Sequence, residues 1–305
     1  MKVLVADDDR CSRLLVSALV MRLGYEVCQA SDGLEALAAL RGPSPPQLAV
    51  LDWVMPGLDG LRLCRAIRGE SADPYTYIIL LTAKGSTDEV VEGLDSGADD
   101  FIAKPVDREV LGARLRSGKR VIELQQQLIA ARERLREQAT HDALTGLWNR
   151  GSILEIMNHE LARCSRERHS LGVMLCDLDH FKHINDTYGH LAGDRVLHHV
   201  AQRLAGAVRS SDYVGRYGGE EFLIILPDCP PEELHKIAER TREAIGSQAV
   251  KYHDGLIPVT VSIGAISRTP HGQMPVTELL LLADDCLLSA KRSGRNQVVS
   301  PRGQT

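Results

Sequence analysis

Residues 208–226, which read VRSSDYVGRYGGEEFLIIL, decide how the second half of the chain is expected to fold. Gly218 and Gly219 stand between two runs of strand-forming residues, an order typical of a β-hairpin with its turn at the glycines. Residues without a Cβ let a ligand approach the backbone closely. Glu220 and Glu221 follow the turn, and like charges about 4 Å apart repel by roughly 4 kcal/mol at an effective dielectric constant of 20. A divalent cation would reverse that repulsion, although a solvated acidic turn explains the pair equally well.

A second acidic stretch lies at 177–186, reads DLDHFKHIND, and follows the buried-strand pattern 171–176. Alternate side chains of a strand share a face, so Asp177 and Asp179 are expected to start on one side of a sheet. Lys182 follows shortly afterwards. Acids at a strand end, a lysine and an acidic hairpin are together the parts of a metal–phosphate site, as used in nucleotidyl transfer.

Four motifs in this order resemble the signature of GGDEF-domain diguanylate cyclases, in the GGEEF form. They are RYGGEEF in the hairpin, DLDHFKHIND, YGHLAGD at 188–194 and KRSGRN at 291–296, and the resemblance covers residues 140–300. It implies an α+β palm-like domain at 141–305, a fold shared with adenylyl cyclases and polymerases. It also implies that two GTP condense to cyclic di-GMP with release of two pyrophosphates. Each domain presents one GTP, so a homodimer is expected, and a tetramer stays open.

The resemblance implies metal ligands. Asp177 and Glu220 would hold Mg²⁺, or Mn²⁺ in its place, together with the backbone carbonyl of Leu178. Glu221 would either bind a second metal ion or accept the proton of the 3′-hydroxyl. Alternation along the strand points Glu221 away from Glu220, so its role is left open.

The resemblance also implies residues that bind GTP. Guanine needs acceptors for N1–H and N2–H₂ and a donor for O6, which favours guanine over adenine at Asn185 and Asp194. The phosphates are expected to lie against the turn glycines, a backbone segment and three cations. These residues are Gly218, Gly219, His180, Phe181, Lys182, Lys291 and Arg295.

Arg209 and Asp212 form an R-x-x-D pattern, which the resemblance implies to be a product-inhibition site for cyclic di-GMP. A guanidinium suits guanine O6 and N7 or a phosphate, and an acid suits guanine N–H groups. Arg163 and Arg240 fall at matching distances in the family and are candidates to complete the site. Near the start of the domain, Asp142 and Arg150 are expected to pair and fix the joint with the preceding segment.

Two other classes of function fit the sequence less well. A non-catalytic receptor for GTP or cyclic di-GMP should have lost parts of the motifs, and none is lost. A DNA-binding regulator needs a basic recognition helix, and no such pattern follows the first domain. The net charge of −5 and the isoelectric point near 6.1 also argue against nucleic-acid binding.

The 305 residues suggest two domains, and 44% hydrophobic with 25% charged residues is ordinary for a globular protein. The first residues run straight into a strand pattern, without a signal sequence. No apolar run approaches transmembrane length. Seven cysteines form no C-x-x-C pair. We therefore expect a cytoplasmic protein with free thiols that does not bind a membrane.

Strand and helix patterns alternate in residues 1–106 and predict a five-stranded, doubly wound parallel sheet of the α/β class. Such sheets bind ligands beyond the carboxyl ends of their strands. Three acids, a hydroxyl and a lysine gather there and predict a Mg²⁺-dependent phosphate site. These residues are Asp7, Asp8, Asp52, Thr82 and Lys104.

Residues 1–106 resemble a response-regulator receiver domain. The resemblance implies that Asp52 is phosphorylated by a histidine kinase or a phosphotransfer protein. Asp7 and Asp8 would hold Mg²⁺, helped by the backbone carbonyl of Val54. Thr82 and Lys104 would contact the phosphoryl oxygens, and Phe101 matches the family's switch aromatic.

Residues 107–140 predict a helical linker. Apolar positions from Val121 to Leu135 recur in steps of three and four, the seam of a coiled coil. We expect a short parallel coiled coil, and the alternative is a single amphipathic helix that lies on its own domain. Gly112 and Gly118 weaken the start of the helix and are candidate hinge positions.

Overall fold

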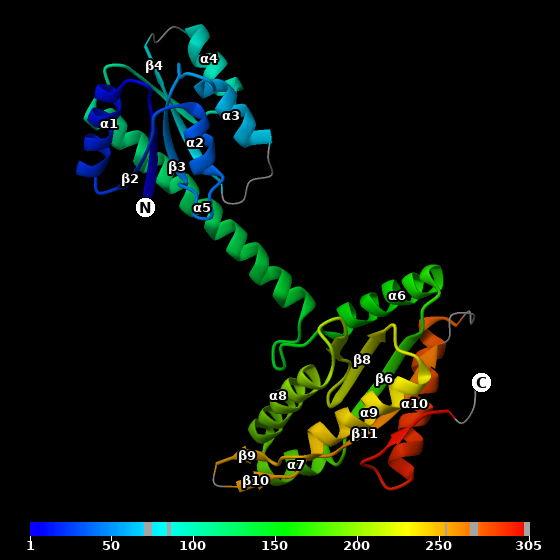
Figure 1. Cartoon of the computed structure of the whole chain (residues 1–305). Coiled ribbons are helices and arrows are strands. Elements are labelled where there is room, and N and C mark those ends of the chain that lie inside the picture. The colour runs from blue at the N-terminus through cyan, green and yellow to red at the C-terminus, as the bar shows by residue number, and fades with distance from the viewer. Residues whose placement is uncertain (70–74, 84–86, 254, 269–273, 302–305) are drawn as a thin grey trace. The chain divides into compact units, whose positions relative to one another are not determined.

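A computed structural model describes the chain except residues 70–74, 84–86, 254, 269–273 and 302–305 (Figure 1). The chain divides into two compact units, Met1–Glu133 and Arg134–Thr305. Among the described residues, no helix has the length and apolar character that crossing a membrane requires. Each of the seven cysteines is a free thiol.

The first unit is built on a five-stranded sheet in the order β2-β1-β3-β4-β5, with every neighbouring pair parallel. All residues of the central strands β3 and β4 are buried, since helices cover both faces of a parallel sheet. This confirms the predicted doubly wound sheet. The strands are β1 (Lys2–Ala6), β2 (Glu26–Ala30), β3 (Leu48–Asp52), β4 (Tyr77–Thr82) and β5 (Asp100–Ala103).

Helices lie on both sides of this sheet (Figure 1). Apolar residues of α1 and α5 pack on one face, and those of α2 and α3 pack on the other. Asp9 and Asp32 begin α1 and α2, because each carboxylate accepts a hydrogen bond from a backbone N–H of the first turn. The helices are α1 (Arg10–Arg22), α2 (Gly33–Leu40), α3 (Gly60–Gly69), α4 (Thr87–Asp95) and α5 (Arg108–Thr140).

Helix α5 has 33 residues and is about 50 Å long at 1.5 Å per residue. It runs through Gly112 and Gly118 without a break, so the expected hinge is not seen there. A Cβ on Gly118 would lie only 2.5 Å from Cδ1 of Tyr77, so this glycine lets the helix pack closely on the first sheet. Leu111, Leu115 and Ile122 are buried in the same core. The early turns of the predicted linker therefore belong to the first unit.

The second unit contains a five-stranded mixed sheet in the order β12-β11-β6-β8-β7. Three of its pairings are antiparallel, and only β11 with β12 is parallel among the described strands. This confirms the predicted α+β class. The strands are β6 (Leu171–Leu178), β7 (Tyr213–Arg216), β8 (Glu221–Pro227), β11 (Val261–Arg268) and β12 (Val298–Val299).

The two faces of the second sheet carry separate cores. Phe222, Ile224 and Leu226 of β8 point into a cluster formed with α7, α8 and α9, and the alternate residues Leu223 and Ile225 point into a cluster formed with α6 and α10. Because successive side chains of a strand point to opposite faces, the all-apolar strand β8 contributes to the cores on both faces of the sheet. The helices are α6 (Arg150–Glu167), α7 (Phe181–Tyr188), α8 (His190–Ala207), α9 (Pro231–Gly246) and α10 (Val276–Arg292).

The apolar stretch 257–265 does not form one continuous strand. The short strand β10 (Gly255–Ile257) pairs only with β9 (Val250–Tyr252) in the described residues, and β11 begins at Val261. Pro258 lies between them and has no N–H to donate to a sheet ladder. The chain therefore leaves one sheet before it enters the other.

Candidate functional site

The predicted hairpin is formed by β7 and β8, and its turn contains both glycines. The backbone N–H groups of Tyr217 and Gly218 donate to the carbonyl of Glu221 at 2.8 and 3.2 Å. A Cβ on Gly218 would lie 2.4 Å from Oε2 of Glu221. The missing side chain at Gly218 therefore leaves room for the Glu221 carboxylate beside the turn.

Cross-strand register places Asp177 of β6 directly opposite Glu221 of β8. Opposed residues of an antiparallel pair share a face, so these two carboxylates lie on the same side of the sheet. Glu220 precedes β8, and its backbone carbonyl accepts a hydrogen bond from the N–H of Leu178 at 3.3 Å. The sequence predicts Glu220 as the partner of Asp177, whereas the register favours Glu221. Which glutamate binds metal stays a prediction.

The electrostatics of this pair fit a cation. Burial raises the pKa of Asp177, against the opposing hydrogen bond and charge of Lys291. Burial also raises the pKa of Glu221, and the neighbouring charge of Asp177 adds to the shift. Two facing carboxylates whose pKa values are raised by burial are a site where a bound cation is stabilised.

Lys291, in the last turn of α10, supplies one positive charge at this point. Its Nζ lies 2.7 Å from Oδ2 of Asp177, which is buried. Asp179 holds the following segment in place, because its Oδ2 accepts from the backbone N–H of Asn296 at 3.0 Å. The hydroxyls of Thr260 and Ser262 donate to the same carboxylate. Asp179 therefore has a structural role that the sequence motif did not reveal.

The backbone at the start of α7 presents N–H groups where phosphate is expected. His180 occupies the N-cap with φ of 57° and, among the described residues, makes no side-chain hydrogen bond to the helix. Phe181 is buried in the core, and Lys182 is exposed. Helix N-termini with unpaired N–H groups bind anions, and the phosphate cradle at this helix start stays a prediction.

The two predicted guanine-binding residues lie on neighbouring helices, Asn185 on α7 and Asp194 on α8. These helices approach closely at Gly193, where a Cβ would lie 1.9 Å from Oδ1 of Asn185. The absence of a side chain at Gly193 thus allows Asn185 to sit against α8, beside the residue that precedes Asp194. Gly193 is part of the YGHLAGD motif, but its packing role was not predicted.

Arg209 and Arg240 line one hollow of about 610 Å³. The backbone N–H of Arg209 donates to Oδ2 of Asp212 at 2.7 Å, and the Arg240 guanidinium donates to the carbonyl of Ala207. Arg163 pairs with Glu160 and Glu167 of its own helix, at 3.0 and 3.7 Å. The structure therefore brings Arg240, rather than Arg163, to the predicted R-x-x-D site.

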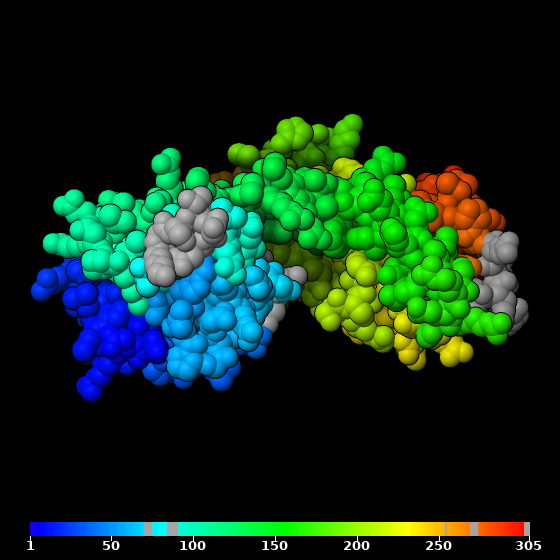
Figure 2. All heavy atoms as spheres, turned by 90° about the horizontal axis from the view of Figure 1, so that it is seen from above, coloured from blue at the N-terminus to red at the C-terminus, as the bar shows by residue number. Residues whose placement is uncertain are grey.

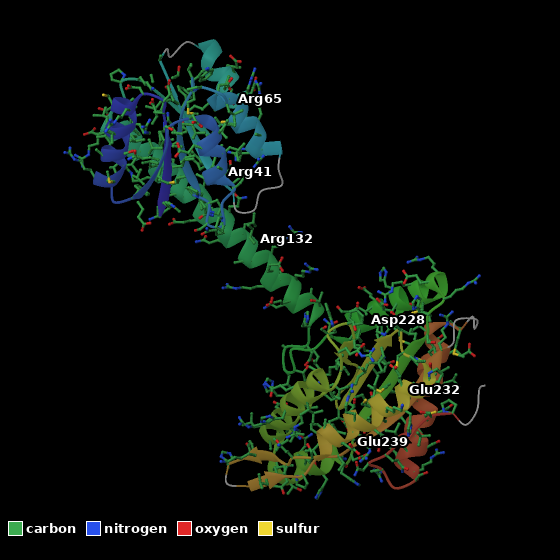
Figure 3. All side chains as sticks on the ribbon, in the orientation of Figure 1. Arg41, Arg65, Arg132, Asp228, Glu232 and Glu239 are labelled. Carbon is green, nitrogen blue, oxygen red and sulfur yellow. The ribbon has the colours of Figure 1, made fainter. Side chains whose placement is uncertain are left out.

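Sequence reasoning missed a further partner of this site. Nη2 of Arg209 lies 3.2 Å from Oε2 of Glu233, at the start of α9. No motif marks Glu233, and only the packing of α9 beside the R-x-x-D segment reveals the contact. Its neighbour Glu232 and the later residue Glu239 lie along the same helix (Figure 3).

The entry turn of the second unit contains an ion pair different from the predicted one. Asp142 pairs with Arg216 at 3.2 Å, and the Arg150 guanidinium lies 4.8 Å from the centre of the Tyr217 ring. The predicted Asp142–Arg150 pair is therefore wrong. Arg216 also donates through Nη2 to the carbonyl of Gly219 at 2.8 Å, so it joins the end of the linker to the Gly-Gly turn.

The first unit gathers its predicted phosphate site at the carboxyl ends of the strands. Asp7, Asp8 and Asp52 each offer an oxygen atom, and these atoms lie within 4.8 Å of one another. Lys104 Nζ lies 2.9 Å from Asp7 and 2.8 Å from Asp52. The triad is consistent with a metal site, since hard cations such as Mg²⁺ prefer carboxylate oxygens.

The environment of Asp52 is that of a buried acid with one close cation. Burial raises the pKa of Asp52, against the hydrogen bond from Lys104. Thr82, at the end of β4, is also buried. Phe101 is partly exposed in β5, and the side chain of Val54 is exposed, with its carbonyl on the loop after β3.

Two protein families match the chain. Residues 139–297 match the family described as diguanylate cyclase, GGDEF domain. This match covers more than half of the chain. The chain belongs to the GGDEF-domain diguanylate cyclases. Residues 3–116 match the response regulator receiver domain, so this GGDEF protein carries an N-terminal receiver that includes the first turns of α5.

Curated proteins match the chain over different lengths. The chain is 32% identical over 300 residues to the response regulator PleD of Caulobacter vibrioides, a match that covers 98% of this chain and 65% of PleD. It is 41% identical over 164 residues to diguanylate cyclase DosC of Escherichia coli, covering 53% of this chain and 35% of DosC. The chain thus spans less than two thirds of either relative.

A solved structure agrees with the second unit and its helix. The coiled coil and GGDEF domain of DgcB from Caulobacter crescentus, in complex with c-di-GMP, superposes with a TM-score of 0.55 at 29% identity. The match covers 63% of this chain and 99% of the DgcB chain.

Proposed function

We propose that the protein is a phosphorylation-controlled diguanylate cyclase, which condenses two GTP into cyclic di-GMP and releases two pyrophosphates. The observation that carries the proposal is the placement of Asp177 opposite Glu221 beside the Gly-Gly turn. The helix N-terminus of α7 and the basic end of α10 flank that pair. Carboxylates, backbone N–H groups and cations around one turn are the parts that phosphoryl-group chemistry requires.

The two facing carboxylates of Asp177 and Glu221 fit a divalent metal ion. One of them, Asp177, already has a cation beside it, since Nζ of Lys291 lies 2.7 Å from its Oδ2. Asp177 and Glu221 would hold Mg²⁺ or Mn²⁺ with the carbonyl of Leu178. Bound there, the metal would stabilise negative charge that develops on the α-phosphate. Glu220 is then the carboxylate left to accept the proton of the attacking 3′-hydroxyl.

The remaining residues of the site orient the nucleotide. Backbone N–H groups at His180 and Phe181 and the ammonium of Lys182 would bind the β- and γ-phosphates. Lys291 and Arg295 would neutralise the same phosphates from the end of α10. Asn185 and Asp194 would read the guanine edge, in line with the close packing of α7 on α8.

The reaction needs two copies of the chain, because each domain presents one nucleotide. A row of exposed apolar side chains on α5 supports pairing through that helix, and α5 is largely exposed in its second half (Figure 2). A second copy of the same helix would cover the row as a parallel coiled coil. The DgcB structure, which contains a coiled coil before its GGDEF domain, supports the same arrangement. The row consists of Val121, Leu124, Leu128 and Leu135.

Control would enter through the receiver. A histidine kinase or phosphotransfer protein would phosphorylate Asp52, with Mg²⁺ held by Asp7, Asp8 and the Val54 carbonyl. Thr82 and Lys104 would contact the phosphoryl group, and the side chain of Phe101 would move inward together with that of Thr82. Such a local change in charge can shift the population of a paired state.

Product would bind at the R-x-x-D site and limit the reaction. The hollow lined by Arg209 and Arg240 offers donors to guanine or phosphate, and Asp212, which accepts from the Arg209 backbone N–H, offers an acceptor for guanine N–H groups. Arg163 stays a candidate for a contribution from its own helix.

The direct test is to incubate the purified full-length protein with GTP and Mg²⁺ and to separate the nucleotides by chromatography. We expect cyclic di-GMP and pyrophosphate in a ratio of one to two. Binding of GTP or cyclic di-GMP without turnover would instead show a non-catalytic receptor.

A further inference from the structure

Lys291 occupies an unusual position for a residue expected to bind phosphate. Its Nζ lies 2.7 Å from Oδ2 of Asp177, and the Asp177 side chain is only 9% exposed. A carboxylate so far removed from water is unfavourable without a counter-charge. Lys291 provides that charge.

The backbone around Lys291 is fixed, so the contact is not the result of a loose helix end. Asp179 accepts the backbone N–H of Asn296 at 3.0 Å, and the side-chain amide of Gln297 donates to the carbonyl of Ala290 at 2.9 Å. The long side chain of Lys291, 30% exposed, is the part that can move. It can therefore leave Asp177 without any change in the fold.

A metal ion on Asp177 would lie close to the ammonium of Lys291. Mg²⁺ binds carboxylate oxygens at about 2.0–2.1 Å, and Nζ of Lys291 already lies 2.7 Å from Oδ2 of Asp177. Two cations on one carboxylate repel each other. Lys291 therefore opposes metal binding to Asp177 until it moves away.

We propose that Lys291 is an internal counter-ion of Asp177 that is exchanged for metal when the nucleotide arrives. The inference rests on the metal site of the proposed function. The incoming triphosphate offers the displaced ammonium a new partner, so metal and nucleotide bind together and neither binds tightly alone. Lys291 thus couples metal binding to nucleotide binding.

The test measures Mn²⁺ binding to the full-length protein without nucleotide, with free Mn²⁺ followed by electron paramagnetic resonance. All variants carry Asp8→Asn and Asp52→Asn, so that the receiver carboxylates do not contribute. We expect Lys291→Met to bind Mn²⁺ at least about ten-fold more tightly, since it frees a buried carboxylate and removes an opposing charge. Arg292→Met, which removes one charge from the adjacent exposed position, is the matched control and should leave the affinity within about two-fold of the parent.

A second titration separates this role from a structural one. Lys291→Met should bind a non-hydrolysable GTP analogue with Mg²⁺ more weakly than the parent, because the ammonium that moves to the phosphates is gone. Damage to the fold would weaken both metal and nucleotide binding, whereas the exchange changes them in opposite directions.

The proposal is overturned if Lys291→Met leaves Mn²⁺ affinity unchanged or lowers it, or if Arg292→Met tightens binding equally. A further variant, Asp177→Asn added to Lys291→Met, should abolish the tight Mn²⁺ site. If Mn²⁺ still binds tightly there, the assignment of the metal site is wrong, which is a failure of the proposed function rather than of the exchange alone.

Discussion

At the scale of single residues, the position of a carboxylate depends on strand register. Glu220 and Glu221 are adjacent and chemically identical, and only the pairing of β8 with β6 decides which of them faces Asp177. A shift of one residue would exchange their faces. The chemistry of the site therefore depends on the hydrogen-bonded ladder that surrounds it.

Asp177→Asn and Glu221→Gln should each lower the rate of cyclic di-GMP formation by on the order of 10³-fold, because each removes a proposed metal ligand. Circular dichroism should show an unchanged fold. Initial rates from GTP and Mg²⁺ provide the measurement. A near-normal rate for Glu221→Gln, with a large loss for Glu220→Gln, would return the ligand role to Glu220.

The role proposed for Glu233 depends on its ion pair with Arg209. Its contact with Arg209 at 3.2 Å would compete with bound product for the guanidinium. Glu233→Gln should tighten cyclic di-GMP binding at the R-x-x-D site by about two- to five-fold, in line with the worth of an exposed ion pair. Calorimetric titration of the product should show this gain.

Glu232→Gln, at the adjacent position on α9 (Figure 3), removes the same charge and is the control. Arg209→Ala should lose the binding altogether. Weaker binding in Glu233→Gln would mean that the product contacts Glu233 directly.

At the scale of elements, the link between α5 and the hairpin is carried by side chains. Asp142 follows α5 and pairs with Arg216 of β7, which donates to Gly219 in the turn. Burial opposes ionisation of Asp142, but hydrogen bonds from Thr145 and the charge of Arg216 together lower its pKa. The segment that enters the domain is thereby tied to the Gly-Gly turn.

The ion pair between Asp142 and Arg216 should make the free energy of unfolding depend on pH. An acid whose pKa is lowered by folding stabilises the fold above its unfolded pKa, and the contribution is lost as pH falls through the folded value. Asp142→Asn should therefore lower stability by about 1–2 kcal/mol at pH 7. The difference should shrink below the ordinary pKa of 3.8. Calorimetric unfolding of the full chain from pH 7 to pH 3 measures it, and a difference independent of pH would contradict an ionic role.

The elements themselves were largely predictable from sequence. Alternating strand and helix patterns predicted the parallel sheet of the first unit, and the Gly-Gly turn predicted the hairpin of the second, because period and turn chemistry are local properties. Contacts between distant positions were not predictable. The register of Glu221, the Asp142–Arg216 pair and the packing of Gly118 on Tyr77 all depend on how separate elements meet.

The length of α5 should matter as well as its seam. One residue inserted after Leu128 rotates everything that follows by about 100°. We expect this variant to lose most of its cyclase activity while it still forms dimers in sedimentation experiments. Insertion of a whole heptad restores the rotation to within about 20° and should recover activity. Equal activity in both variants would show that the helix does not set the orientation of the cyclase domains.

At the scale of the whole molecule, the receiver and the cyclase domain are joined along the chain by α5 alone. Phosphate on Asp52 would draw in Thr82 and Phe101 and change the surface near α4 and α5. Pairing of two receivers through that surface would bring two α5 seams together. A signal at one domain would then control the meeting of two half-sites in the other, as a shift between unpaired and paired states.

The measurement that tests this account most directly is the initial rate of cyclic di-GMP formation by the full-length protein, as a function of protein concentration, with and without beryllofluoride. The account predicts a rate that rises faster than protein concentration when the protein is dilute, and a stimulation by beryllofluoride that is largest there and absent in Asp52→Asn. A rate strictly proportional to protein concentration and unaffected by beryllofluoride would contradict control by assembly, and the absence of any cyclic di-GMP would contradict the cyclase itself.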